Sequence, residues 1–115
     1  MWMTLFSVAL GGALGSVLRY GFGLWLTFPA GTLTVNVLGS FLIGTVSAWA
    51  AGRSLAPLLV FGLLGGFTTF SAFSLDVLRL AEAGRLAFAG AYAVASVALS
   101  LLACGFGLWL ARGLA

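Results

Sequence analysis

The charged residues of this chain are too few to cover the surface of a water-soluble fold. Five arginines, one aspartate and one glutamate make up 6% of the 115 residues, and 63% are hydrophobic. A soluble domain is about 25% charged, and the mean hydropathy here is +1.22. The composition predicts an integral membrane protein. It excludes soluble enzymes, nucleic-acid-binding domains and secreted disulfide scaffolds.

Charges and turn residues divide the chain into four apolar runs, at approximately 2–27, 30–51, 55–78 and 86–111. A membrane-spanning helix needs roughly 20 residues, so four spans fit and five do not. The connectors are too short for a second domain. We expect an all-α membrane protein with a single transmembrane domain over 1–115 and both termini on one side.

Several kinds of chemistry are missing from the sequence. There is no histidine, and Cys104 is the one cysteine, so neither an intrachain disulfide nor a metal site of Cys and His is expected. The pI near 10 does not indicate a nucleic-acid partner, because the arginines are scattered and form no basic patch.

The arginines divide almost evenly between the two ends of the four-span arrangement. Arg53 and Arg112 fall on one side, Arg79 and Arg85 on the other, and Arg19 lies inside the first run. Orientation follows the bias of Lys and Arg between loops. An even division predicts insertion in both orientations and an antiparallel homodimer. A single orientation, fixed by one arginine or by the insertion machinery, is the alternative.

Two polar stripes run along the second and fourth spans. Each repeats every four residues and so falls within about an 80° arc of its helix. They are Thr32, Asn36 and Ser40, and Tyr92, Ser96 and Ser100. A lone Ser or Thr usually bonds a carbonyl of its own helix, whereas two stripes together can line a polar path. No stripe residue titrates near neutral pH, which excludes a proton relay.

The third run contains two adjacent glycines and two adjacent threonines, within Gly-Gly-Phe-Thr-Thr-Phe-Ser-Ala-Phe-Ser at 65–74. Glycine and β-branched residues in mid-span favour a broken helix. A break frees carbonyl oxygens, which protein, water or a cation such as sodium must satisfy. Phe70 and Phe73 follow on one helical face, and their positive ring edges can face an anion or simply pack.

Arg19 allows two interpretations, and the spacing of the small residues allows one. Arg19 can snorkel to the interface, or it can supply a positive potential at an aqueous vestibule. The spacing of Gly11 and Gly15, and of Ser40 and Gly44, predicts close helix packing.

Three segments together resemble the Fluc, or CrcB, family of fluoride channels over essentially the whole chain. They are Gly-Gly-Ala-Leu-Gly-Ser-Val-Leu-Arg-Tyr at 11–20, Gly-Thr-Leu-Thr-Val-Asn-Val-Leu-Gly-Ser-Phe at 31–41, and the stretch at 65–74. The resemblance implies a dual-topology antiparallel homodimer in the cell (inner) membrane, with two fluoride pores and one central sodium ion.

The resemblance also implies roles for individual residues. Phe70 and Phe73 would present ring edges to fluoride, Asn36 an amide donor and Ser71 a nearby hydroxyl. Four residues would form the polar track: Tyr92, Ser96 and Ser100, with Thr32 facing them. Arg19 would lie near the vestibule. Gly65 and Thr68 would give backbone carbonyls to the structural sodium.

Two positions depart from the family pattern. Ala72 stands where many members have threonine, and Asp76 where glutamate is usual.

The implied activity is passive flow of fluoride down its gradient, which lowers cytoplasmic fluoride and relieves its toxicity without any enzymatic step. The expected partners are fluoride, membrane lipid and a second copy of the chain. Two alternatives remain. A small multidrug-type exporter normally needs an acid in the first span, and here the only acids are Asp76 and Glu82. A non-transporting membrane assembly subunit would leave the polar stripes unexplained.

Overall fold

The computed structural model describes residues 1–114, and these form helices without any strand. Four helical stretches are long and apolar enough to cross a membrane: Trp2–Trp25, Ala30–Ala50, Pro57–Glu82 and Leu86–Gly113. They correspond to α1 (Trp2–Trp25), α2 (Ala30–Ala50), the composite third span, and α5 (Leu86–Leu114). The prediction of an all-α membrane protein with four spans is confirmed.

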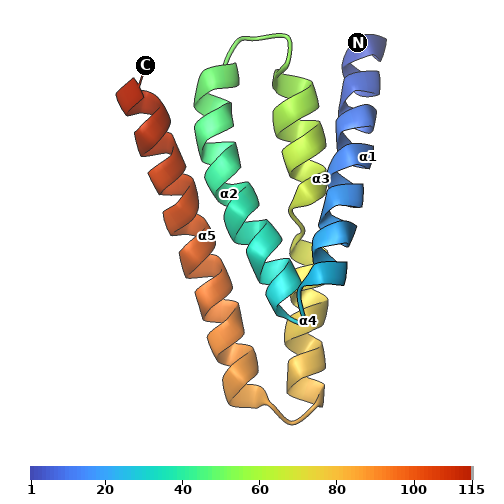
Figure 1. Ribbon diagram of the computed structural model, residues 1–115, viewed down its shortest axis with the longest axis vertical. Helices are drawn as coiled ribbons and strands as arrows, with labels where there is room; N and C mark the ends of the chain where they lie inside the picture. The colour runs from blue at the N-terminus through green and yellow to red at the C-terminus, as the bar shows by residue number, and fades with distance from the viewer. Residues whose placement is uncertain (115) are drawn as a thin grey trace.

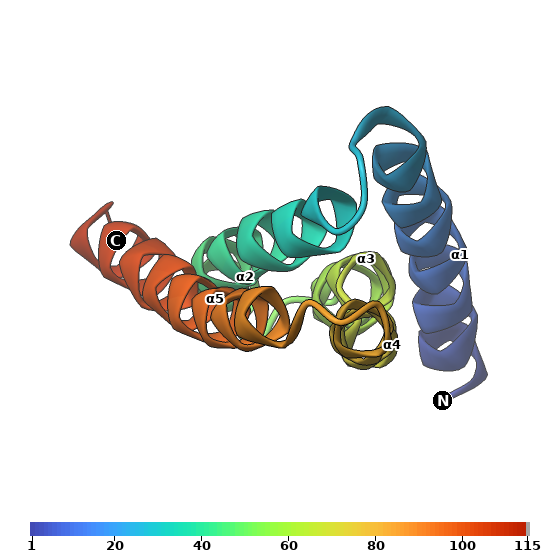
Figure 2. The same cartoon turned by 90° about the horizontal axis from the view of Figure 1, so that it is seen from below.

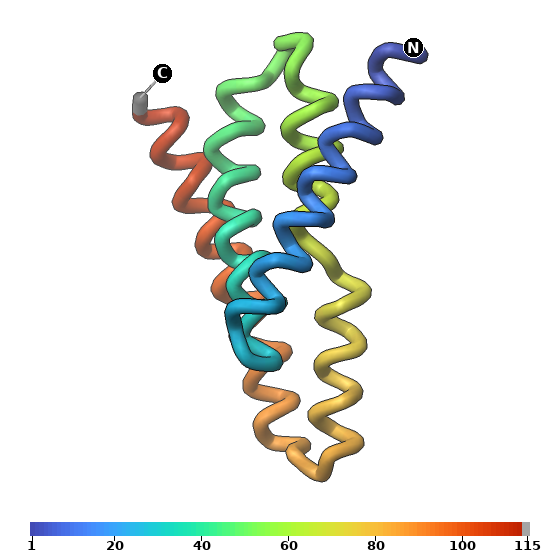
Figure 3. Tube along the Cα trace, turned by 45° about the vertical axis from the view of Figure 1, so that its right-hand side comes forward, coloured from blue at the N-terminus to red at the C-terminus, as the bar shows by residue number. Residues whose placement is uncertain are grey.

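The four spans run alternately up and down, so both termini lie at the same end of the bundle (Figures 1 and 3). Seen from below, α2 and α5 lie side by side, the third span occupies the middle, and α1 lies on its far side (Figure 2). The third span therefore contacts other helices on both sides.

Glycines allow the closest helix approaches. A Cβ on Gly15 would clash with the backbone of Leu63 and Phe67 in the third span, and one on Gly44 would clash with the backbone of Cys104 in α5. Helices in lipid associate by this kind of small-residue packing. The predicted close contact at Gly15 is confirmed.

The third span is broken at its threonines. It consists of a π-helical segment η1 (Pro57–Leu64), a short α3 (Gly65–Phe67) and α4 (Phe70–Glu82). Thr68 and Thr69 between them are extended, with φ/ψ of −89°/156° and −154°/122°. The predicted break is confirmed, although Gly65 stays helical at −62°/−38°. Thr69 caps α4, because its side chain accepts a hydrogen bond from the Ala72 N–H.

The connector before α5 is shorter than the polar stretch suggests. Helix α4 continues through Glu82, past the expected end at 78, and Gly84 follows with φ of +81°. The Arg85 N–H bonds the Leu80 carbonyl and the Gly84 N–H bonds that of Ala81. These are the two bonds of a Schellman motif, which glycine favours.

Few apolar side chains are buried. One cluster lies between α4 and α5 and consists of Leu80, Ala89 and Tyr92, with Phe73 packed against it. Val35, Leu64 and Phe67 are also buried. Most other large apolar side chains are exposed on the isolated chain. In a membrane such side chains face lipid or another protein surface.

Candidate functional site

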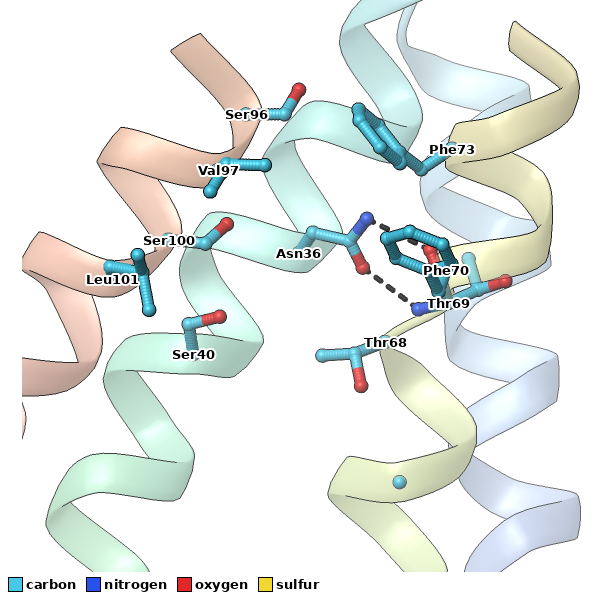
Figure 4. Close-up of a pocket in the computed structure, with 11 residues that line it drawn as sticks. Asn36, Ser40, Thr68, Thr69, Phe70, Phe73, Ser96, Val97, Ser100 and Leu101 are labelled. Carbon is cyan, nitrogen blue, oxygen red and sulfur yellow. Dashed lines mark hydrogen bonds between the residues drawn. The ribbon is translucent and has the colours of Figure 1, made fainter. Parts of the chain in front are cut away.

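A groove of about 460 Å³ runs beside the break in the third span (Figure 4). Residues from α2, α3, the break, α4 and α5 line it: Asn36, Ser40, Gly65, Thr68, Thr69, Phe70, Phe73, Ser96, Val97, Ser100 and Leu101. The structure thus brings together seven of the predicted site residues: Asn36, Gly65, Thr68, Phe70, Phe73, Ser96 and Ser100. The remaining four, Arg19, Thr32, Ser71 and Tyr92, lie outside this lining.

Asn36 holds the break from the side of α2. Its Nδ2 donates to the Thr69 carbonyl at 3.0 Å, and its Oδ1 accepts from the Thr69 N–H at 2.8 Å (Figure 4). Both bonds are partly buried, where an unpaired backbone group is costly. Because Nδ2 carries two hydrogens, one remains beyond the bond to Thr69. Sequence reasoning missed Thr69, although threonine before a helix is a recognised cap signal.

The break also frees backbone carbonyls from their helical partners, and two of the residues concerned, Gly65 and Thr68, line the groove. In a continuous helix the Thr69 N–H would bond the Gly65 carbonyl, but here Asn36 takes it. Within residues 1–114 no side chain donates a hydrogen bond to the carbonyl of Gly65 or Thr68. The same part of the chain has no cluster of three His, Cys, Asp or Glu side chains. Backbone oxygens suit a hard cation.

The two phenylalanines occupy one turn of α4 beside the groove. Their ring centroids are 5.4 Å apart, and that of Phe73 is 5.7 Å from the Tyr92 ring. Phe73 is therefore held by its neighbours. Phe70 is 75% exposed on the isolated chain, so its ring is available to whatever covers the groove.

Ser96 brings a hydroxyl to the groove that no protein group satisfies. The residue is 4% exposed, and within residues 1–114 its Oγ has no hydrogen-bond partner. Buried polar atoms are nearly always paired. The Ser96 hydroxyl is therefore a buried polar group at the wall of the groove that lacks a hydrogen-bond partner among the described residues.

Tyr92 and Asp76 form a buried pair next to the groove. Each is 6% exposed, and the Tyr92 hydroxyl donates to Asp76 Oδ2 at 3.1 Å. The carboxylate thus faces a tyrosine on α5 and does not line the groove. Sequence reasoning noted both residues without pairing them, since no spacing rule connects positions on different helices.

Arg19 contacts the break from the side of α1. Its Nε donates to the Gly66 carbonyl at 3.1 Å, another oxygen near the end of α3. Arg19 and Thr32 line a separate cavity of about 260 Å³. Ser71 lies on the first turn of α4, with its Oγ 3.1 Å from the Thr69 Oγ1.

Comparison with known proteins gives consistent matches. The family model described as CrcB-like protein, Camphor Resistance (CrcB), matches residues 6–108. The chain is 51% identical to the fluoride-specific ion channel FluC of Paracoccus denitrificans, over 96% of each chain. It is 51% identical to that of Rhizobium etli strain CIAT 652 (96% and 97% covered) and 47% identical to that of Nitrobacter winogradskyi (96% and 97%).

Proposed function

This chain belongs to the CrcB-like family, and we propose that it is a fluoride-selective ion channel that passes fluoride passively out of the cell. The relatives that carry the name of fluoride channel match it over nearly the full length. The observation in the fold that carries the proposal is the groove beside Phe70 and Phe73, whose wall holds the buried, unpartnered Ser96 hydroxyl. No step needs a nucleotide, a nucleophile or a proton carrier, so the protein is a transporter and not an enzyme.

The physical problem for the channel is desolvation. Moving a small bare anion into a medium of low dielectric costs on the order of 20 kcal/mol. In the proposed path the Ser96 and Ser100 hydroxyls and the second amide hydrogen of Asn36 replace lost water. The ring edges of Phe70 and Phe73 add a weaker positive field. Closely spaced donors around a small ion disfavour the larger chloride.

We further propose that the groove is completed by a second, antiparallel copy of the chain in the cell (inner) membrane. On one copy the groove is open, and the Phe70 ring is 75% exposed. A conduction path for an anion must be enclosed, because lipid cannot solvate fluoride. The even distribution of arginines between the two ends agrees with insertion in both orientations. A second copy of this chain is therefore the proposed cover.

The carbonyls freed by the break fit a structural sodium ion. The carbonyl oxygens of Gly65 and Thr68 would hold it, with the same two from the second copy. The sodium ion would bind the broken spans of both copies and would supply a fixed positive charge between them. The residues themselves contribute neutral oxygens, so they place no negative charge in the anion path.

Fluoride efflux from liposomes that contain only this protein tests the proposal. We expect fast fluoride release and hardly any chloride release, measured with ion-selective electrodes. Equal leakage of both ions, or of neither, would overturn it. Single-molecule photobleaching of labelled protein tests the dimer separately, and a monomer that still conducts would overturn the proposed cover. Replacing sodium by N-methylglucamine should lower the stability of the dimer. An unchanged dimer stability would contradict the proposed sodium site.

A further inference from the structure

A second cavity, of about 860 Å³, lies between the ends of α2 and α5 near the C-terminal side of the bundle. Its lining combines two arginines with hydroxyl and apolar side chains: Thr45, Ser47, Ala48, Trp49, Arg53, Leu108, Leu110, Ala111 and Arg112. None of these residues lines the groove beside the break. The proposed fluoride path therefore leaves this cavity unexplained.

The cavity is positively charged without a neighbouring acid. Arg53 and Arg112 line it, whereas Asp76 and Glu82, the only acids of the sequence, both belong to α4. Helix α4 forms the opposite end of the bundle (Figure 1). The other pair of loop arginines, Arg79 and Arg85, shares that end with Glu82. Within one chain, the two ends thus differ in their capacity to attract an anion.

Arg53 is held in place by its neighbour on α2. Its Nε donates to the Trp49 carbonyl at 2.7 Å, and its guanidinium carbon lies 4.6 Å from the centre of the Trp49 ring. These contacts use Nε and one face of the guanidinium. The two terminal nitrogens form the fork that matches phosphate oxygens, and holding the side chain beforehand lowers the entropy cost of binding.

The remaining lining is suited to a lipid and not to a free ion. Leu108, Leu110 and Ala111 give an apolar wall on α5. The two hydroxyls already donate within α2, Thr45 Oγ1 to the Leu42 carbonyl and Ser47 Oγ to the Gly44 carbonyl. Tryptophan and arginine at the end of a span are typical of the headgroup level of a bilayer. A ligand that matches both the arginines and the apolar wall has an anionic head and an acyl chain.

We propose that this cavity binds the headgroup of an anionic phospholipid, with its phosphate on Arg53 and Arg112 and its acyl chain along Leu108 and Leu110. Basic side chains at a membrane surface recognise such headgroups through charge. The fork of arginine adds bonding to two phosphate oxygens. The site is separate from the proposed fluoride path, so lipid binding and fluoride conduction can be tested independently.

Native mass spectrometry of the protein in detergent doped with phosphatidylglycerol, or with zwitterionic phosphatidylethanolamine, tests the proposal. The double variant R53Q/R112Q removes both cations. The variant R79Q/R85Q is its matched control, because it removes the same charge at the other end, and Arg85 also stacks on an aromatic ring, that of Phe88 at 4.3 Å.

We expect wild type and the control to retain phosphatidylglycerol in preference to phosphatidylethanolamine. In R53Q/R112Q its apparent affinity should fall by about thirtyfold, at about fivefold for each basic side chain. Equal loss in the two double variants, or no preference between the lipids, would overturn the site. Displacement of the lipid by millimolar inorganic phosphate would overturn its assignment to a lipid.

Two measurements keep the test valid if the double variant folds poorly. The single variants R53Q and R112Q should each lose about fivefold. The variant W49L leaves both charges in place but removes the aromatic surface under Arg53, and we expect it to weaken phosphatidylglycerol binding measurably. Unchanged binding in all three variants would also contradict the proposal.

Discussion

Asn36 offers the sharpest test of how the broken span is held, through the variant N36A. The substitution removes both hydrogen bonds to Thr69, of 2.8 and 3.0 Å. It leaves one N–H and one carbonyl without a partner, inside a bundle where water is scarce. The break should then loosen, and Phe70, which directly follows Thr69, should move with it.

The magnitude follows from measured hydrogen bonds between membrane helices. Each is worth about 0.6 kcal/mol on average and at most about 1.7 kcal/mol. Two bonds therefore give about 1–3 kcal/mol. We expect the upper part of that range, since the two bonds hold the two peptide units on either side of the Thr69 Cα and both are lost together. Fluoride efflux should fall at least tenfold, because the ring of Phe70 and the carbonyl of Thr68 leave their positions.

The assay is unfolding by dodecyl sulfate in mixed micelles, followed by the fluorescence of the four tryptophans. The variant S40A is the matched control: Ser40 lies one turn further along α2 and lines the same groove, but does not bond the break. Its free energy of unfolding should stay within about 0.5 kcal/mol of wild type. If N36A were equally harmless, Asn36 would not hold the break, and its amide would serve the groove alone.

Three further predictions test other contacts of the third span. F70I should suppress fluoride efflux while leaving the free energy of unfolding of the single chain nearly unchanged, because the ring is 75% exposed; normal efflux would remove Phe70 from the path. G15A should destabilise the bundle by about 1–3 kcal/mol in the same unfolding assay, since its Cβ meets backbone. G21A, with nothing within 4 Å, should be neutral, and equal effects would refute the packing argument. R19Q should cost about 1–2 kcal/mol through the lost bond to Gly66, and an unchanged unfolding curve would show that this bond contributes nothing.

The spans could be predicted from the sequence because lipid imposes a simple rule on it. Each spanning helix must satisfy its own backbone and present apolar side chains over about 30 Å. The four apolar runs meet that rule, and the structure follows them. The polar stretch before the fourth span is different, because a helix end depends on local capping. Gly84 ends α4 through the Schellman bonds, after Arg79 and Glu82 have already joined the helix.

The position of the break could be predicted only to within a few residues. Intrinsic propensity favours a break at Gly65 and Gly66, yet both are helical. The reason is packing: a Cβ on Gly66 would lie 2.7 Å from the Gly12 carbonyl. Gly66 allows α1 to approach, and Thr68 and Thr69 take the extended conformation. Helix propensity is a property of one segment of the sequence. Close helix packing also depends on the partner helix, which the sequence of that segment does not specify.

The same limit explains which polar residues meet in the groove. A period of four places Asn36 and Ser96 on stripes, but it does not say which turn of each stripe faces the break. In the structure Asn36 forms hydrogen bonds with Thr69, and Tyr92 forms one with Asp76. The Ser96 hydroxyl has no hydrogen-bond partner within residues 1–114. In lipid, backbone groups freed by a break must be satisfied before a polar side chain is available for a ligand. The proposed contacts with fluoride therefore come from what remains: an unpartnered hydroxyl, the second amide hydrogen of Asn36 and the ring edges.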